Sequence, residues 1–351
     1  MDIKLIIYSR EQHNVQIVTG FKLLKQRGDI SSLTIIKRYS LLDKMPNEHI
    51  IECMLNEKIK IAYDTHDGFY FSNKEERDKY NKYIESVDYY FQRSYNKEEN
   101  LDLNEPYKIF PLGLNYFVTC PGNPLTKIDF KSKNLHDFLA SIQRYSYAKQ
   151  IYPEKFEERA LSSNEHPKIL FLTRTWENSP KEINEFRASC IRLLKKKFGK
   201  HVIAGFKPTA YAKSNFEDCL VPNILTKRKN YLQLVKESDI CITTTGLHRS
   251  IGWKFAEYIA ASKAIVTEKL NYSPGPELKA NVNFFEFDTS EELINQVMKL
   301  VNNKNLLNDM KKSNQSYYNM FLKPDVMIFN SLKTVLESLK KERTNKTNDS
   351  K

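Results

Sequence analysis

The chain has 351 residues, of which 40% are hydrophobic and 28% are charged, and its formal net charge is +12. This length exceeds one ordinary α/β domain and suits two, and the composition excludes a disordered or fibrous protein. No apolar run approaches the roughly 18 residues of a membrane span. The N-terminus lacks the basic segment of a secretion signal, so we expect a protein inside the cell.

The cysteines and the charge limit the function only broadly. The five cysteines stand far apart without a C-x-x-C pair, which favours reduced, mostly buried thiols over disulfides or a zinc site; they are Cys53, Cys120, Cys190, Cys219 and Cys241. The basic surface is expected to attract phosphates, nucleic acid or an anionic membrane leaflet. Composition alone does not choose among these partners or exclude a merely solvated surface.

In the first half, short β-like runs alternate with amphipathic stretches, which is typical of parallel βαβ units. Strands are predicted at Ile3–Tyr8, Leu33–Ile36, Lys58–Tyr63, Val87–Phe91 and Lys108–Phe110. Helices are predicted at Val15–Gln26, Lys74–Ile84 and Leu135–Tyr147.

The second half begins the same alternation again. A strand at Lys168–Thr173 precedes a helix at Lys181–Phe198, which has Pro180 at its start and Gly199 just past its end, as helix punctuation prefers. Further strands are predicted at His201–Ala204, Asp239–Thr243, Ala264–Thr267 and Phe284–Phe287. Further helices are predicted at Tyr231–Lys236, Gly252–Ser262, Glu291–Val301 and Leu306–Met320.

The polar stretch Tyr152–Pro167 has no clear periodicity and is the expected linker. We therefore predict an α/β protein with two Rossmann-like, doubly wound domains that face each other across a cleft. Such folds bind ligands beyond the carboxyl ends of their strands, so we expect the ligands in that cleft. The predicted parts are an N-terminal domain at 1–155, a C-terminal domain at 165–322, a helix at 323–340 that packs back toward the N-terminal domain, and a disordered tail at 341–351.

The segment Thr243–Tyr258 joins a predicted buried strand to an amphipathic helix through a turn of small residues. The start of such a helix offers free backbone N–H groups and a positive dipole end, which suit a diphosphate. Gly246 permits close backbone approach, Ser250 can donate or cap, and Lys254 or Arg249 can supply charge. The segment has no G-x-G-x-x-G or P-loop spacing, so a plain capped strand-to-helix turn is the alternative.

This segment resembles the donor-binding region of group 1 glycosyltransferases of the GT-B fold. In that family the helix begins near a glutamate and leads to a strand of small residues, and Glu257–Val266 stands in that place. The resemblance implies that Glu257 contacts the ribose hydroxyls of a nucleoside diphosphate. The donor-binding residues predicted in this way are Gly246, Leu247, His248, Arg249, Ser250, Lys254 and Glu257.

Other segments resemble the same family in order and spacing, so that the resemblance covers nearly the whole chain. They are Val87–Phe91, Lys108–Asn115, Asp239–Ile242 and Asn281–Leu293. One position departs from the pattern: Arg249 stands where many retaining members carry a glutamate, eight residues before the ribose-binding one. The donor sugar and the stereochemistry therefore stay open, and His248 and Arg249 are candidates for the missing donor contacts.

Arg174 follows the first strand of the C-terminal half, where a side chain can reach the predicted cleft. Arginine suits a diphosphate because its planar charged fork binds two oxygens at once. The family often has an arginine or lysine near this position, so the resemblance favours contact between Arg174 and the leaving diphosphate. A surface salt bridge is the alternative, and the nearby Trp176 fits either the cleft or helix packing.

The segment Tyr63–Gly68 places a run of titratable groups at the end of a predicted strand. Histidine is suited to proton transfer near neutrality, and a neighbouring carboxylate can orient it. His66 or Asp67 is therefore the predicted base for an acceptor hydroxyl, and an Asx turn capped by Asp64 or Asp67 is the alternative. The D-x-H-D spacing also allows a metal, but no second ligand cluster completes such a site, so we expect none.

These residues and the resemblance together predict a cytoplasmic glycosyltransferase of the hexosyltransferase type. It would move a sugar from a UDP- or GDP-linked donor to a glycan, lipid-linked or other acceptor in cell-surface polysaccharide or glycoconjugate synthesis, without a metal or other cofactor. Arg174, Lys254 and the turn amides would stabilise the leaving diphosphate. Peripheral contact with the anionic inner face of the plasma membrane is also expected. The alternatives are a nucleic-acid glycosylating or binding protein, another GT-B enzyme such as a nucleotide-sugar epimerase, and a non-catalytic homologue that serves as a partner subunit.

Overall fold

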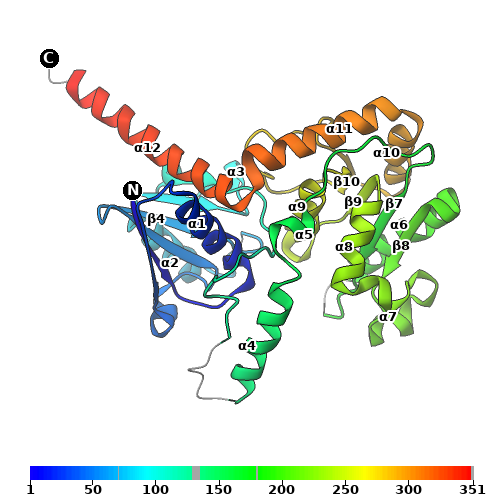
Figure 1. Cartoon of the computed structure of the whole chain (residues 1–351), viewed down its shortest axis with the longest axis horizontal. Helices are drawn as coiled ribbons and strands as arrows, with labels where there is room; N and C mark the ends of the chain where they lie inside the picture. Colours follow the sequence, from blue (N-terminus) through cyan, green and yellow to red (C-terminus); the bar gives the residue numbers. More distant parts are fainter. Residues whose placement is uncertain (70, 129–134, 179–180, 349–351) are drawn as a thin grey trace. The chain divides into compact units, whose positions relative to one another are not determined.

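The chain folds into two compact units. The computed structural model describes residues 1–69, 71–128, 135–178 and 181–348. Unit 1 consists of Met1–Lys149 and Met320–Lys351, and unit 2 of Gln150–Asn319. Each has a central β-sheet flanked by helices, so each is an α/β unit of the Rossmann type (Figure 1).

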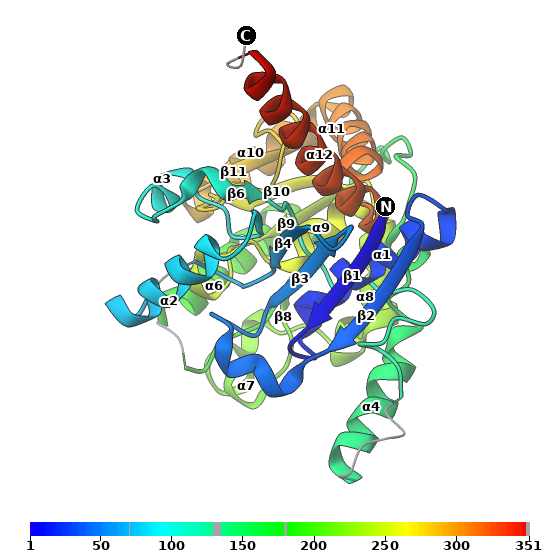
Figure 2. The ribbon, with the colours of Figure 1, turned by 90° about the vertical axis from the view of Figure 1, so that its left-hand side faces the viewer.

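Unit 1 contains a six-stranded sheet in the order β2-β1-β3-β4-β5-β6. Its strands are β1 (Asp2–Ile7), β2 (Ser32–Lys37), β3 (Ile50–Leu55), β4 (Ile59–Asp64), β5 (Tyr89–Gln92) and β6 (Ile109–Pro111). Strand β3 runs antiparallel to β1 and β4, whereas the other pairs in this sheet are parallel. Figure 2 shows β1 to β4 side by side.

Strand β3 corrects the predicted topology of this half, which contained only parallel βαβ units. A tight turn joins β3 directly to β4, and both Asn56 (φ 50°) and Glu57 (φ 56°) adopt positive φ there. Turns of this kind match the right-handed twist of a hairpin, and asparagine tolerates the left-handed conformation well. The alternation of strands and helices in the sequence therefore conceals one hairpin, and the sheet of unit 1 is mixed rather than wholly parallel.

The helices of unit 1 lie at α1 (Val15–Arg27), α2 (Lys74–Glu85), α3 (Lys97–Asn100), α4 (Leu135–Ala148) and α12 (Pro324–Asn348). Helix α12 packs against α1, although unit 2 separates the two helices in the sequence. Its Ser331 Oγ lies 2.8 Å from the hydroxyl oxygen of the buried Tyr63 in β4. The helix continues to Asn348, through the stretch expected to be a disordered tail, because lysine, glutamate and arginine are good helix formers; residues 349–351 lie outside the described part of the chain.

Unit 2 contains a five-stranded sheet in the order β11-β10-β9-β7-β8, in which all pairs are parallel. Its strands are β7 (Ile169–Thr173), β8 (Val202–Phe206), β9 (Ile240–Thr243), β10 (Ala264–Glu268) and β11 (Phe284–Phe287). Each strand predicted for this half is present, with small shifts at the ends. This is the doubly wound arrangement that the sequence predicted.

The helices of unit 2 lie at α5 (Pro153–Phe156), α6 (Lys181–Phe198), α7 (Ala210–Asn215), α8 (Arg228–Glu237), α9 (Trp253–Ala260), α10 (Ser290–Asn302) and α11 (Lys304–Tyr317). Helix α6 packs against β8 and α10, whereas α9 packs against β9 and β10. Short 3₁₀ segments lie at Gln12–Asn14, Tyr39–Lys44, Pro106–Lys108, Gly199–His201, Glu217–Cys219, Asn223–Thr226 and Leu247–Arg249, and a π-helical segment at Tyr318–Leu322.

All five cysteines are buried and unbridged, which confirms the prediction of buried thiols. Among the helices of the described residues, none combines the length and apolar character that crossing a membrane requires.

The contact between α1 and α12 depends on Gly20. A Cβ atom added at Gly20 would overlap the carbonyl group of Pro324 and the side chain of Ile328. We expect Gly20→Ala to lower the free energy of unfolding by about 1–3 kcal/mol, because neither the backbone of α12 nor a buried isoleucine can give way cheaply. Urea denaturation measures this.

Gly252→Ala is the matched control, because a Cβ there meets no atom within 4 Å. This variant should keep its stability or gain about 0.4–1 kcal/mol. Equal stability of Gly20→Ala and the parent protein would show that the two helices are not held as closely as described.

Candidate functional site

The strand order of unit 2 defines a topological switch point between β7 and β9. The chain passes from β7 to β8 on one side and then returns to β9 on the other side of β7. In open α/β sheets, ligands bind at the carboxyl ends of the strands that flank such a point. Arg174 follows the end of β7 and the turn at 244–250 follows the end of β9, so both predicted donor segments lie there.

A buried arginine that the sequence analysis missed holds these two segments together. Arg187, on α6, is 4% exposed. It donates hydrogen bonds to the carbonyl oxygen of Arg174 (2.9 Å), to Thr244 Oγ1 (2.9 Å) and to the carbonyl oxygen of Thr245 (2.8 Å). One guanidinium thus binds the loops after both strands, and its fixed fork of donors suits this role.

The guanidinium of Arg187 stays charged although it is buried. Burial lowers the pKa of the Arg187 guanidinium to about 10, against the opposing effect of the Glu268 carboxylate, so the group stays charged at neutral pH. Glu268 ends β10 and accepts a hydrogen bond from the Thr245 amide at 2.9 Å. The loop after β9 is therefore held between a cation and an anion.

Arg174 itself is exposed and lies against an aromatic ring. Its guanidinium carbon is 3.7 Å from the centre of the Trp176 ring, a distance typical of a cation–π contact. Asn184, one turn of α6 before Arg187, donates to the Trp176 carbonyl oxygen (2.8 Å) and accepts from the Trp176 amide (3.0 Å). Two side chains on one face of α6 therefore fix the loop that presents Arg174.

The turn after β9 is closed by hydrogen bonds of its own, and Ser250 takes part in them. His248 (φ 61°) and Arg249 (φ 55°) both adopt positive φ, while the Gly246 amide donates to the Ser250 carbonyl oxygen at 2.8 Å. Ser250 Oγ donates to the Leu247 carbonyl oxygen at 2.9 Å, so it closes the turn instead of capping the helix. Helix α9 begins after Gly252 without a side-chain cap on its first amides.

Lys254 lies among other cations at the switch point. Its Nζ donates to the carbonyl oxygen of Leu172 in β7, which stands 82 residues earlier in the chain. Burial lowers the pKa of Lys254 to about 8; the Glu257 carboxylate opposes this shift, and the charges of Arg187, Arg174 and Arg228 add to it. Arg174 and Lys254, the two cations predicted for the diphosphate, are therefore close enough for their charges to interact.

Glu257 is buried (3% exposed) and both of its oxygens have partners. Arg228 Nη1 lies 2.9 Å from Oε1, and the Tyr231 hydroxyl donates to Oε2 at 2.9 Å. Arg228 in turn lies over the ring of Phe156, 4.9 Å from its centre. A ribose at Glu257 would have to share these partners, so the predicted ribose contact stays a prediction.

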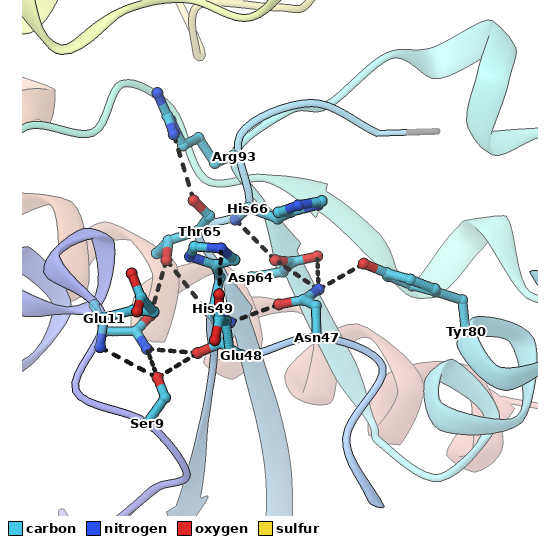
Figure 3. Close-up of polar contacts among 11 residues, drawn as sticks. Ser9, Glu11, Asn47, Glu48, His49, Asp64, Thr65, His66, Tyr80 and Arg93 are labelled. Carbon is cyan, nitrogen blue, oxygen red and sulfur yellow. Dashed lines mark hydrogen bonds and ion pairs between the residues drawn. The ribbon is translucent and has the colours of Figure 1, made fainter. Parts of the chain in front are cut away.

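In unit 1, the predicted base cluster is built around Asp64, the last residue of β4 (Figure 3). Asp64 is 1% exposed. It accepts hydrogen bonds from the His66 amide (2.9 Å) and the Tyr90 hydroxyl. This is the Asx turn that the sequence left as an alternative. It orients the residues that follow, because the chain must turn out of the sheet at His66.

His66 and Asp67 meet different neighbours. Asp67 Oδ1 lies 3.1 Å from Nη1 of Arg93, a buried residue that follows β5. The His66 ring stacks on His49, with ring centres 5.0 Å apart, and His49 lies equally close to His13. Three imidazoles thus form a column at the edge of the sheet where β1 and β4 end.

Two histidines of the column, His49 and His13, are kept neutral. Burial lowers the pKa of His49 to about 4, and the neighbouring His66 and Arg93 contribute in the same direction. Burial also lowers the pKa of His13. Neither residue appeared among the sequence predictions, since His49 precedes the unpredicted strand β3 and His13 follows β1 only after a turn.

One group of side chains in this region could hold a cation. Glu11, Glu48 and His49 offer one ligand atom each, all within 4.8 Å of one another. Glu11 and Glu48 stand close enough to interact, since burial and then the Glu48 charge raise the pKa of Glu11. The sequence prediction assigned no metal here, because these ligands come from separate segments of the chain.

A cavity of about 360 Å³ lies elsewhere in unit 1. Its lining includes Lys58, Asp88 and Lys108, which precede β4, β5 and β6 respectively, and Ser338 of α12. The cavity therefore stands at the amino ends of these strands, the edge opposite to the one where α/β sheets bind their ligands. None of the predicted site residues lines it.

Comparison with known proteins finds likeness only among solved structures. No protein-family model and no curated protein matches the sequence. A glycosyltransferase from Rickettsia africae is 15% identical, with 80% of this chain and 70% of that chain covered and a TM-score of 0.45. HepE from Anabaena, in complex with UDP-glucose, is 10% identical, with 95% and 100% covered and a TM-score of 0.43. TarM from S. aureus, in complex with fondaparinux, alpha-GlcNAc-glycerol and UDP, is 11% identical, with 76% and 48% covered and a TM-score of 0.44, so this chain spans about half the length of TarM.

The lowered pKa of His49 predicts a stability that falls in mild acid. An unfolded histidine titrates near pH 6.5 and His49 titrates near 4 in the folded protein. Between these values the unfolded chain binds more protons, so the free energy of unfolding decreases as the pH falls. His49 alone should account for about 2 kcal/mol of loss between pH 7 and pH 5.

Urea denaturation of the parent protein and of His49→Gln at both pH values measures this difference. The variant should show a smaller loss, because glutamine cannot titrate. His201→Gln, in unit 2, is the control and should keep the parent dependence. An equal loss for the parent and His49→Gln would contradict the depressed pKa of His49.

Proposed function

We propose that this protein is a glycosyltransferase whose unit 2 binds a nucleoside-diphosphate sugar at its switch point. The observation that carries the proposal is the group of cations around Arg174 and Lys254. Burial lowers the pKa of Lys254 most, and the neighbouring charges of Arg187, Arg174 and Arg228 lower it further, because like charges held together destabilise one another. A diphosphate among them would relieve this repulsion, and the amides at the start of α9 would add to its binding.

The same arrangement suits the chemistry of sugar transfer. When the bond between the anomeric carbon and the diphosphate oxygen breaks, negative charge grows on the diphosphate. Donors that are already in place stabilise this charge without a reorganisation cost at the moment of reaction. Arg187 and Asn184 provide that order by holding the loops of Arg174 and Thr244 in fixed positions. Glu257 is the candidate for the ribose, on the family resemblance and on its place in α9.

For the acceptor, we propose His66 as the base in a reaction that inverts the anomeric carbon. Asp67 is the second candidate, but its ion pair with Arg93 makes its carboxylate a weaker proton acceptor. The base would take the proton of the acceptor hydroxyl as its oxygen bonds to the anomeric carbon. The acceptor is proposed to be a glycan or lipid-linked sugar, and the donor to carry UDP or GDP.

Calorimetry with UDP, GDP and ADP tests the donor site. At least one of these nucleotides should bind the parent protein, and Arg174→Ala should weaken that binding about 10- to 100-fold, as the loss of a charge-assisted pair implies. Arg192→Ala is the matched control, since Arg192 lies on the same unit and pairs with Asp218 at 2.6 Å. Equal affinity of the two variants would remove Arg174 from the site, and no binding by the parent protein would end the proposal.

Release of nucleoside diphosphate from UDP- or GDP-sugars, with and without added glycans, tests the acceptor base. His66→Ala should lower turnover about 10²- to 10⁴-fold while nucleotide affinity stays unchanged, because the nucleotide is proposed to be held by unit 2. Asp67→Asn should have a smaller effect, and His166→Ala in unit 2 none. Full activity of His66→Ala would show that the segment is only a turn, and early melting with lost nucleotide binding would make its role structural.

A further inference from the structure

The cavity at the amino ends of β4, β5 and β6 has the dimensions of a ligand site. Its volume of about 360 Å³ lies near the lower end of the roughly 300–1,000 Å³ that small-molecule sites occupy. Ser338 of α12 lines it together with residues of the sheet, so the cavity is complete only when α12 has packed onto unit 1. The rule that places ligands at the carboxyl edge concerns sites built by the strand ends alone, and this cavity has a different origin.

Three aromatic rings give the cavity a broad apolar surface. Tyr89 of β5 and Phe110 of β6 lie side by side, with ring centres 5.8 Å apart and planes tilted by 37°. The third ring belongs to Tyr107, which is 71% exposed. Because most of this side chain faces water, a ligand that covered its ring would gain free energy from the water that it displaces.

Tyr107 is held in place although it is exposed. Its hydroxyl donates to Glu105 Oε1 at 2.6 Å, and Lys108 Nζ lies 2.7 Å from Glu105 Oε2. Lys108 also donates to the carbonyl oxygen of Glu85, the last residue of α2, at 3.2 Å. A side chain that is ordered before binding loses little conformational entropy when a ligand covers it. The ring of Tyr107 is therefore suited to serve as a platform for a ligand.

The polar side chains of the cavity include both donors and acceptors. Lys58 is exposed and offers an ammonium group. Asp88 accepts from the Lys60 amide through Oδ2 at 2.7 Å, and its carboxylate has further lone pairs for a ligand. Ser338 donates to the carbonyl oxygen of Thr334 at 3.0 Å, and its hydroxyl can still accept. A purely apolar ligand would leave these groups without partners, and a ligand with one net charge would be repelled by either Lys58 or Asp88.

We propose that this cavity binds a mono- or disaccharide. The C–H groups on the face of a sugar ring carry partial positive charge, which the negative face of an aromatic ring attracts. The hydroxyl groups around the same sugar ring donate to carboxylates and accept from ammonium groups. Stacking on Tyr107, with hydrogen bonds to Lys58 and Asp88, would satisfy both kinds of surface at once. The site goes beyond the proposed sugar transfer, because different residues form it and binding there requires no nucleotide.

Saturation-transfer-difference NMR of the full chain, without nucleotide, tests the proposal. The probes are maltose, cellobiose, lactose and N,N′-diacetylchitobiose, which are uncharged and differ in linkage and substituents. At least one of them should receive saturation from the parent protein. Tyr107→Ala should weaken the binding of that disaccharide at least about threefold, because the stacking surface is lost. Tyr107→Phe should lie between the two, because the ring remains but no longer has a hydroxyl to bind Glu105.

Tyr145→Ala is the matched control, since Tyr145 is another exposed tyrosine of unit 1 (40% exposed) that does not line the cavity, and it should bind the disaccharide like the parent protein. Equal binding by Tyr107→Ala and the parent, or no saturation of any probe by the parent, would overturn the proposal. Binding that depends on His66 and not on Tyr107 would place the sugar at the proposed acceptor base. That result would overturn the cavity site and leave the proposed function intact.

Discussion

The buried guanidinium of Arg187 is the interaction on which the carboxyl edge of unit 2 depends. Three hydrogen bonds from this one side chain join the segments after β7 and β9. The parallel pairing of the strands brings these segments to the same edge of the sheet, but it does not fix their conformation. A cation is costly to bury unless it is well paired. Here Glu268 and three oxygens compensate it, and the positions of Arg174, Trp176 and the turn after β9 follow from that compensation.

The two units carry different charges at the edge of the sheet where the carboxyl ends of the parallel strands lie. Unit 2 gathers cations there, and burial together with the neighbouring arginine charges lowers the pKa of Lys254. Unit 1 places the neutral imidazoles of His13 and His49 beside carboxylates, and its Arg93 pairs with Asp67. In the proposed sugar transfer, the edge of unit 2 would hold the negative charge of the diphosphate, and the edge of unit 1 would receive the acceptor hydroxyl beside His66.

The sequence predicted those features of the structure that depend on residues close together in the chain, and it missed those that depend on distant ones. The strands of unit 2 are continuous apolar runs with turn-forming or polar residues at their ends, so the local sequence was enough to predict them. Arg174 could therefore be placed directly after β7. Strand β3 was missed because two residues with positive φ, Asn56 and Glu57, turn the chain back without a helix. Arg187 and His49 were missed because their roles arise from partners distant in the chain, which no local pattern reveals.

The return of α12 to unit 1 has a consequence for the order in which the chain can fold. Unit 2 is an insertion within unit 1, since its residues separate α1 from α12. During synthesis, the groove at Gly20 and the hydroxyl of Tyr63 remain without their partners until all of unit 2 has been made. Unit 2 can complete its parallel sheet first, and the last helix then closes the earlier unit. Unit 1, although it comes first in the sequence, can therefore be completed only after unit 2 has been synthesised.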